Sequence, residues 1–160
     1  MKTERVFVGL GANLGVPQTT LQRALAALAA LPQTRLVAHS SLYRTAPILA
    51  IGSDFINAVA ELRTALQPHA LLDALQAIEL AHGRERPYRH APRTLDLDLL
   101  LFGQRVVQEP GLEVPHPRLH ERAFVLQPLI ELAPTLVHPR LGPLQLLLAA
   151  TLDQPIKRLP

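Results

Sequence analysis

The chain has 160 residues, a length that suits one domain with a substantial core. Hydrophobic residues make up 48% of it, too many for a disordered chain, yet no uncharged apolar run reaches the roughly 18 residues of a membrane span. There is no cysteine, which excludes disulfides, thiolate catalysis and cysteine–zinc sites, and the formal charge of +3 suits an anionic ligand. Because the first residues also lack the apolar segment of a signal peptide, we expect a cytoplasmic protein with a single domain over residues 1–160.

The first predicted strand, Glu4 to Leu10, is short and apolar, and a glycine-rich loop follows it from Gly9 to Gly15. Such a loop between a strand and a helix can bind phosphate, but the spacing is not that of a dinucleotide-binding turn, and the lysine of a P-loop is missing. A tight turn permitted by glycine is the preferred interpretation. Leucines at helical spacing then predict a helix from Gln18 to Leu31, with Pro17 at its start and Pro32 at its end.

Two further strands are predicted at residues 34–44 and 54–64, with a proline- and glycine-containing loop between them. An asparagine near the start of a strand is usually a turn or capping residue, but one that shares a face with an exposed aromatic ring can instead hydrogen-bond a flat heterocycle. Alternation assigns the side chains of the second strand to two faces: Phe55, Asn57, Val59 and Glu61 on one, and Ile56, Ala58, Ala60 and Leu62 on the other.

A second helix is predicted over residues 68–82, ending at Gly83, with Gln76 and Glu79 on one side of it. A polar loop rich in arginine and histidine follows, over residues 84–91.

The segment from Pro92 to Phe102 is the most informative in the chain, because two carboxylates interrupt its most hydrophobic run. As a strand it places Thr94, Asp96, Asp98 and Leu100 on one face, and Leu95, Leu97, Leu99 and Leu101 on the other. Adjacent carboxylates repel each other unless a proton or a cation intervenes, and Mg²⁺ is the usual cation near phosphates. A helix would separate the two acids, but the alternation and the turn at Gly103 favour the strand.

After a turn into residues 105–108, the chain is expected to be irregular from Leu112 to Arg118 and helical over residues 124–132 and 144–152. The predicted order is therefore β-α-β-β-α-β plus a C-terminal helical extension. This order predicts an α+β fold with a ferredoxin-like core, in which a mainly antiparallel sheet carries helices on one face.

The two aspartates lie directly after a cluster of arginines, at positions 84, 86, 89 and 93. Carboxylates bind metals and guanidinium groups bind phosphate oxygens, so this combination favours a Mg²⁺–polyphosphate site over a merely solvated strand face held by Arg–Asp pairs. His116 and His120 have the spacing of a helical metal pair, but Pro117 and the missing third ligand favour a phosphate-facing or capping histidine and a surface histidine.

The chain resembles the 6-hydroxymethyl-7,8-dihydropterin pyrophosphokinases of folate biosynthesis over nearly its full length. The most specific segments are P-R-T-L-D-L-D, residues 92–98, and V-P-H-P-R, residues 114–118. Further matches are Gly11-Ala12-Asn13-Leu14, residues 40–45, 55–58, 76–79, Gly83-Arg84, and Arg122-Ala123-Phe124. The chain differs from the family pattern at Ala46, where a second proline is frequent, and at His90, where tryptophan is expected.

The resemblance implies transfer of pyrophosphate from ATP to the hydroxymethyl oxygen of the pterin, with release of AMP. It implies that Asp96 and Asp98 hold two Mg²⁺ ions and that Arg84 and Arg93 stabilise charge on the transferred group. The implied pterin site consists of Thr45, Ala46, Ile48, Phe55, Asn57 and Phe124, with the two rings as a sandwich. The implied ATP site consists of Leu72, Gln76, Glu79, Arg84, Arg93, Leu99, Leu112, His116 and Arg122.

Two other functions compete with this one. A ferredoxin-like sheet can bind single-stranded RNA through exposed aromatic residues, but aromatic residues are only 4% of the chain and the corresponding motif is absent. The second is another Mg²⁺-dependent nucleotidyl or phosphoryl transferase or phosphohydrolase. We expect a monomer that binds ATP and the pterin, and neither nucleic acid nor membrane.

Overall fold

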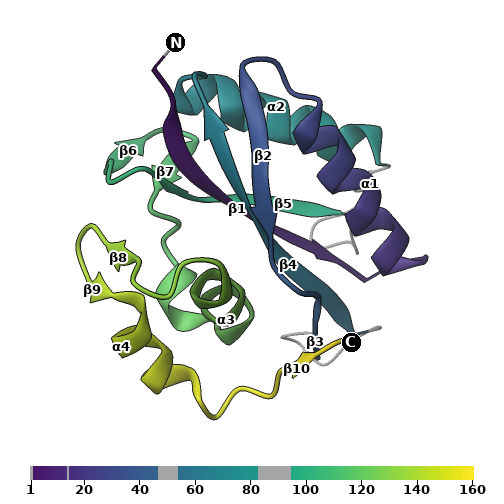
Figure 1. Ribbon diagram of the computed structural model, residues 1–160, viewed down its shortest axis with the longest axis vertical. Helices are drawn as coiled ribbons and strands as arrows, with labels where there is room; N and C mark the ends of the chain where they lie inside the picture. The colour runs from purple at the N-terminus through teal and green to yellow at the C-terminus, as the bar shows by residue number, and fades with distance from the viewer. Residues whose placement is uncertain (1, 14, 47–53, 83–94) are drawn as a thin grey trace.

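The computed structural model of the chain describes residues 2–13, 15–46, 54–82 and 95–160. Its centre is an antiparallel sheet in which neighbouring strands run in the order β10-β3-β4-β1-β5, while β2 also pairs with β4 (Figure 1). The strands are β1 (Glu4–Ala12), β2 (Thr34–His39), β3 (Tyr43–Thr45), β4 (Phe55–Thr64), β5 (Asp96–Phe102) and β10 (Lys157–Arg158). The two longest strands are β1 and β4, and all of β1 pairs with residues 56–64 of β4 at the middle of the sheet.

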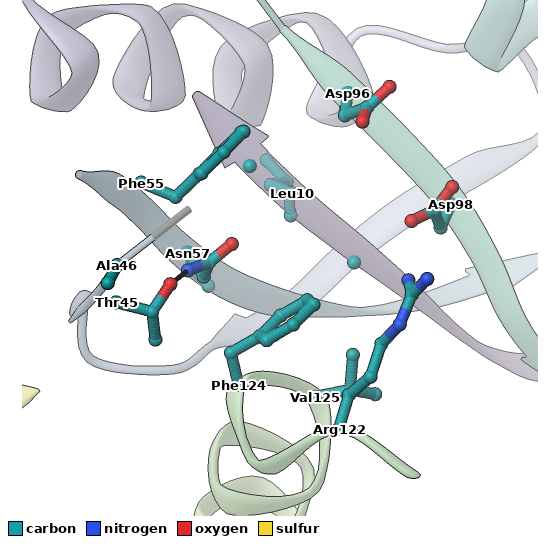
Figure 2. A pocket seen from close by; sticks show the side chains of 13 residues that line it. Leu10, Thr45, Ala46, Phe55, Asn57, Asp96, Asp98, Arg122, Phe124 and Val125 are labelled. Carbon is teal, nitrogen blue, oxygen red and sulfur yellow. Dashed lines mark hydrogen bonds between the residues drawn. The ribbon is translucent and has the colours of Figure 1, made fainter. Parts of the chain in front are cut away.

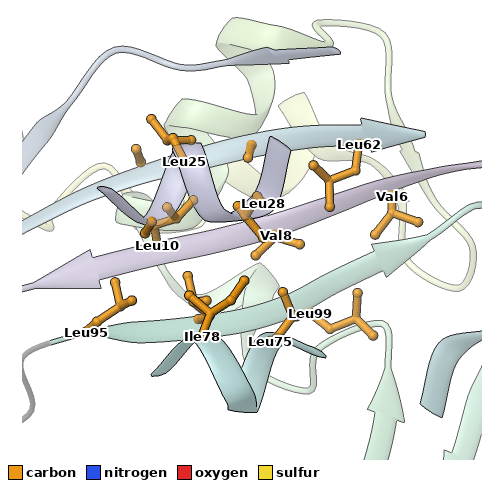
Figure 3. Close-up of a cluster of buried hydrophobic side chains, with 14 of the residues drawn as sticks. Val6, Val8, Leu10, Leu25, Leu28, Leu62, Leu75, Ile78, Leu95 and Leu99 are labelled. Atoms are coloured by element: carbon orange, nitrogen blue, oxygen red, sulfur yellow. The ribbon is translucent and has the colours of Figure 1, made fainter. Parts of the chain in front are cut away.

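Helices α1 (Pro17–Ala29) and α2 (Pro68–Ala81) cover one face of the sheet (Figure 1). Each begins with a proline, which suits the first helical turn because its missing N–H has no partner there. The apolar stripes of both helices meet alternate residues of the strands, and Figure 3 shows Leu25 and Leu28 of α1 and Leu75 and Ile78 of α2 in this core. The helical periodicity read from the sequence is confirmed for both helices.

The opposite face of the sheet is covered by α3 (Ala123–Leu132) (Figure 1). Phe7, Val59 and Leu100 point to this side and pack with Leu126 and Leu129 in a second buried cluster. The expected placement of helices on one face thus holds for α1 and α2, while α3 makes the arrangement three layers. The chain then continues through α4 (Leu144–Leu148) and a 3₁₀ turn (Ala149–Thr151) to β10.

Three local expectations were wrong. Residues 34–44 form two strands, because the strand is interrupted at Ser40. The buried hydroxyl of Ser40 accepts the backbone N–H of Val59 at 2.9 Å. The first strand extends to Ala12, so Gly9 and Gly11 belong to the sheet and not to a loop. Residues 112–118 are not wholly irregular, since β7 (Leu112–Val114) pairs with β6 (Val107–Glu109) in a hairpin.

The expected division of faces in β5 is correct up to Leu100 and fails at Leu101. Leu95, Leu97 and Leu99 lie in the core under α1 and α2, whereas Leu100 and Leu101 both belong to the cluster under α3. The cause is an irregularity in the pairing with β1, in which Val8 is opposite Leu99 and Phe7 is opposite Leu101. One extra residue in a strand reverses the alternation beyond it, and the apolar run gives no sign of where it lies.

In the part of the chain that the structure describes, no helix has the length and apolar character required to cross a bilayer.

His138 ends β8 (Val137–His138), which pairs with β9 (Gly142–Pro143), and its side chain holds the turn between them. The ring is buried, and its Nδ1 accepts the backbone N–H groups of Arg140 and Leu141, each at 3.1 Å. Burial lowers the pKa of His138, and the positive charges of His120 and Arg140 lower it further. Nδ1 must remain unprotonated for this turn to form.

We expect the free energy of unfolding to fall as the pH decreases. A histidine with a lowered pKa in the folded state binds its proton more readily when unfolded, so its contribution is complete above about pH 6.5 and is lost below it. In His138→Asn, the amide oxygen still accepts a hydrogen bond but no longer titrates, so the slope of stability with pH should decrease by up to about 1.4 kcal/mol per pH unit. Urea unfolding at several pH values from 7.5 to 5.0 measures this slope. His39→Asn, which removes an exposed imidazole of β2, is the control. An unchanged slope in His138→Asn would contradict this assignment.

Candidate active site

A cavity of about 170 Å³ opens between the sheet and the first turn of α3. Its lining comes from β1, β3, β4, β5 and α3, which are widely separated in sequence (Figure 2). The residues are Gly9, Leu10, Gly11, Thr45, Ala46, Phe55, Asn57, Ala58, Asp96, Asp98, Arg122, Phe124 and Val125. The structure thus brings together eight of the residues that the sequence singled out, from four separate segments.

Two aromatic rings stand on opposite sides of this cavity. Phe55 comes from the first position of β4 and Phe124 from the second position of α3, and Figure 2 shows the two side chains on either side of Asn57. Both side chains are only half-buried, unlike Phe7 and Phe102 of the core. Partly exposed aromatic rings on two sides of one cavity can provide flat apolar walls for a planar ligand.

Asn57 lies at the base of the cavity between these rings and has one fixed partner. Its Nδ2 donates to the hydroxyl of Thr45 at 2.9 Å, which leaves the amide oxygen directed to the cavity (Figure 2). The side chain is 5% exposed, so its orientation is set by packing. A β-carbon on Gly11 would lie 3.1 Å from the amide oxygen, and glycine is therefore the residue that leaves Asn57 room.

Asp96 and Asp98 form the other end of the cavity. Both are half-buried, and their carboxylates project from the same side of β5 (Figure 2). In the pairing with β1, Asp98 is opposite Gly9 and Asp96 is opposite Gly11. No side chain of β1 therefore stands directly opposite either acid.

The described residues contain no group of three or more histidine, aspartate or glutamate side chains arranged to hold a metal. A cation bound here would be held by the carboxylates of Asp96 and Asp98 together with further ligands. This arrangement suits Mg²⁺, which is commonly held by one or two carboxylates and by the phosphates of a substrate.

Glu79 supports the strand that carries the two acids. It is 3% exposed, and one oxygen of its carboxylate accepts the backbone N–H of Leu97 at 2.8 Å. Leu97 lies between Asp96 and Asp98, on the edge of β5 that faces away from β1. The carboxylate therefore takes the position of a neighbouring strand and fixes the backbone between the two acids.

A second groove, of about 440 Å³, continues from the first, and Asp98 lines both. Its walls come from α2, β5, the β6–β7 hairpin and the segment after it. The lining residues are Leu72, Leu97, Asp98, Leu99, Glu109, Gly111, Leu112, Glu113, His116 and Pro117. Four of the expected ATP contacts line this groove: Leu72, Leu99, Leu112 and His116. Gln76 is exposed on α2 outside the lining, and Arg122 lines the first cavity instead.

His116 is held beside β5 in a defined state. Its backbone N–H donates to the carbonyl of Leu100 at 2.9 Å, and its Nδ1 accepts the backbone N–H of Arg118 at 3.1 Å. Burial lowers the pKa of His116, and the charges of Arg122 and Arg118 act in the same direction. The ring is therefore neutral near pH 7, with Nε2–H available as a donor.

Ile48, Arg84 and Arg93 lie outside the described residues, so their expected roles remain predictions. Leu10, Val125 and Glu113 line the cavities but were not singled out from the sequence, and Gly9 was interpreted only as part of a tight turn. The glycines carried a signal, since two of them separated by one residue in an apolar strand indicate close approach of another group. Glu113 carried none, because a single acid between apolar residues is typical of an exposed strand position.

Residues 7–134 match the family model described as 7,8-dihydro-6-hydroxymethylpterin-pyrophosphokinase. The chain belongs to this family. Its members are ATP-dependent diphosphotransferases of folate biosynthesis, and the chain is accordingly a pyrophosphokinase that transfers pyrophosphate to hydroxymethyldihydropterin.

Curated relatives support the same family over most of the chain. A 2-amino-4-hydroxy-6-hydroxymethyldihydropteridine pyrophosphokinase of Pseudomonas aeruginosa is 52% identical over 158 residues, which are 98% of each chain. The enzyme with the same name from Haemophilus influenzae is 45% identical over 134 residues, covering 83% of this chain and 84% of the relative.

Solved structures show the fold of the pyrophosphokinase domain at much lower identity. An HPPK-DHPS protein crystallised with substrates matches with a TM-score of 0.78 at 12% identity, over 96% of this chain and 44% of that one. The HPPK-DHPS of Plasmodium falciparum gives a TM-score of 0.74 at 14% identity, over 92% of this chain and 42% of that one. The chain thus spans less than half of these longer proteins.

The role of Glu79 can be tested by stability. Glu79→Leu leaves the Leu97 N–H without this partner, so the free energy of unfolding should fall by about 1–3 kcal/mol. Glu79→Gln keeps an acceptor oxygen and should lose less. Asp73→Ala, which removes an exposed carboxylate from the same helix, should change stability by less than about 0.5 kcal/mol. Urea unfolding measures all three, and a Glu79→Leu protein as stable as Asp73→Ala would rule out this support.

Proposed function

We propose that the pyrophosphokinase reaction takes place where the two cavities meet, with the pterin in the first and ATP in the second. The observation that supports this arrangement is the position of Asp98, which lines both. A group bound there is beside both ligands, as transfer between them requires. Holding two reactants in register replaces an encounter in solution by an effectively intramolecular step.

The pterin site consists of Thr45, Ala46, Ile48, Phe55, Asn57 and Phe124. In this proposal the pterin ring lies between Phe55 and Phe124, and the amide oxygen of Asn57 accepts from the donor edge of the heterocycle. The position of both phenylalanines in the lining of one cavity and the restrained amide support this binding mode.

The cation site consists of Asp96 and Asp98 with two Mg²⁺ ions. Bound there, the ions would neutralise phosphate charge and orient the attacking and leaving oxygens. Two carboxylates on one side of β5, with glycines on the neighbouring strand, fit such ions together with a phosphate chain. In this proposal the catalytic residues are Asp96 and Asp98, which hold the ions, and Arg84 and Arg93, which stabilise charge on the transferred group.

ATP occupies the second groove, with Leu72, Leu99 and Leu112 against the base. The neutral His116 donates from Nε2 to ribose or phosphate oxygens, and Arg122 stabilises phosphate charge beside Asp98. Two further residues of the ATP site come from α2. Gln76 contributes from the exposed surface of the helix, and Glu79 contributes indirectly, by holding the backbone of β5 at Leu97.

We extend the proposal to the whole chain as a single domain, 1–160, with a ferredoxin-like core, a C-terminal helical extension, a cytoplasmic location and a monomeric state. The strand order β5-β1-β4-β2 and the parallel relation of β1 to β2 across β4 support the core assignment. RNA binding is disfavoured, because α3 covers the face of the sheet that holds Phe7 and Val59.

The products distinguish the remaining enzyme activities. Incubation with ATP, Mg²⁺ and 6-hydroxymethyl-7,8-dihydropterin should yield AMP and the pterin diphosphate, identified by mass spectrometry. Release of pyrophosphate would indicate nucleotidyl transfer instead. RNA binding that persists in EDTA, without ATP turnover, would indicate a binding module.

Removing either acid should abolish turnover. Asp98→Asn and Asp96→Asn keep the side-chain size but lose the charge that holds Mg²⁺, so kcat should fall by more than about a thousandfold, equivalent to about 4 kcal/mol of barrier. Asp73→Asn, an exposed position on α2, is the control. Steady-state AMP production at saturating Mg²⁺ measures the effect. Near-normal turnover in either active-site variant would refute its role as a metal ligand.

Phe124→Ala should weaken binding of the pterin much more than binding of ATP. It removes one wall of the sandwich, and the loss should be about tenfold or more in the dissociation constant for the pterin. Phe124→Leu keeps apolar volume without a flat ring, so its dissociation constant for the pterin should lie between those of the wild type and Phe124→Ala. Calorimetric titration with each ligand separately decides the matter, and equal losses for both would contradict the sandwich.

A further inference from the structure

The side-chain amide of Gln154 hydrogen-bonds the backbone on both sides of Arg122. Its Oε1 accepts the N–H of Ala123 at 2.9 Å, and its Nε2 donates to the carbonyl of Glu121 at 2.7 Å. One amide thus holds the residue before and the residue after Arg122. Both distances are those of well-formed hydrogen bonds.

Arg122 occupies a junction that needs such support. It lies between the 3₁₀ turn Leu119–Glu121 and α3, in an extended conformation with φ −123° and ψ 113°, and its own side chain makes no capping hydrogen bond. The first N–H groups of a helix have no partner within the helix. Gln154 supplies one for Ala123 from 31 positions along the chain.

The direction of the Arg122 side chain depends on this junction. From the start of α3 the side chain runs along the cavity toward Asp98 (Figure 2), and its guanidinium carbon lies 5.5 Å from the centre of the Phe124 ring. A rotation of the backbone at Arg122 would move the end of this long side chain several times further than the backbone itself. The aim of the guanidinium is therefore sensitive to the two hydrogen bonds on either side.

Gln154 is itself on an anchored segment. Its backbone N–H donates to the carbonyl of Thr151 at 3.0 Å. Further along, β10 pairs with β3, and the N–H of Leu159 donates to the carbonyl of Leu42 at 2.8 Å. The segment from 154 to 159 thus connects the start of α3 to β3, which ends at Thr45 of the same cavity.

We propose that Gln154 is a positioning residue for pyrophosphate transfer: its amide fixes the backbone at Arg122 and so aims the guanidinium at the phosphate charge beside Asp98. This inference rests on the proposed function for the role of Arg122, but the clamp itself is a feature of the chain. Gln154 is outside the lining of both proposed substrate cavities, and in this proposal it acts through Arg122.

The first test separates turnover from binding and stability. Gln154→Leu is nearly isosteric and removes both hydrogen bonds, so kcat should fall about tenfold while the KM for the pterin changes less than about twofold. Gln154→Glu keeps the acceptor and loses the donor, so its kcat should be intermediate. Gln145→Leu is the matched control, because its Nε2 donates to the carbonyl of Pro134 at 2.8 Å, remote from the cavity lining. Equal kcat in Gln154→Leu and Gln145→Leu would overturn the proposal.

The second test asks whether the effect passes through Arg122. In an Arg122→Ala background, Gln154→Leu should reduce kcat by less than about twofold, because the group that it aims is already missing. A full tenfold loss in that background would show that Gln154 acts by general destabilisation and would overturn the proposal.

A third measurement needs no turnover. The ¹⁵N–¹H resonance of the Arg122 side-chain Nε should shift in Gln154→Leu and not in Gln145→Leu, and an unshifted resonance would overturn the clamp. If the wild-type chain yields no AMP, the proposed function fails, and this resonance still decides whether Gln154 sets the position of Arg122.

Discussion

Antiparallel pairing between β1 and β5 sets Gly9 opposite Asp98 and Gly11 opposite Asp96. The site depends on this register. A shift by one residue would turn both acids into the core and place leucines in the cavity. The pairing of β1 with β4 on its other side brings Gly11 opposite Asn57, where the missing side chain leaves room for the amide. Two contacts hold β5 in this register. Glu79 accepts a hydrogen bond at the outer edge of the strand, and the leucines of β5 pack against α2 in the core.

Much of this arrangement was readable in the sequence. The 3.6-residue periodicity of two helices and the alternation in residues 55–62 are local signals, and local signals predicted the core faces correctly. The proximity of Asp96 and Asp98 also follows from the period of a strand. The facing positions of Phe55 and Phe124 do not, because they depend on how α3 packs across the sheet. Their pairing was expected from resemblance to the pterin pyrophosphokinases, and the structure places both rings in one cavity.

The failures have a common physical origin. The reversal of faces at Leu101 arises from an irregularity in the pairing of β5 with β1, and at the break at Ser40 a side-chain hydroxyl accepts the backbone N–H of Val59 on β4. Glu79 is expected at the ATP site from the family resemblance alone, and the role that the structure shows for it, as acceptor of the Leu97 N–H on β5, has no signal in the sequence. In each case the deciding partner is distant in sequence, and neither propensity nor spacing identifies it. The pairing of residues 157–158 with β3 belongs to the same class.

The carboxylate of Glu79 also has a consequence for the solubility of the protein. β5 is an outer strand of the sheet, and the free amides of such a strand can template the addition of a strand from another molecule. Glu79 occupies the amide of Leu97, and it places a carboxylate where an incoming strand would have to present a carbonyl. On the opposite side of the sheet, β10 covers the edge of β3. The same contacts that hold the site in place thus discourage edge-to-edge aggregation of the folded chain.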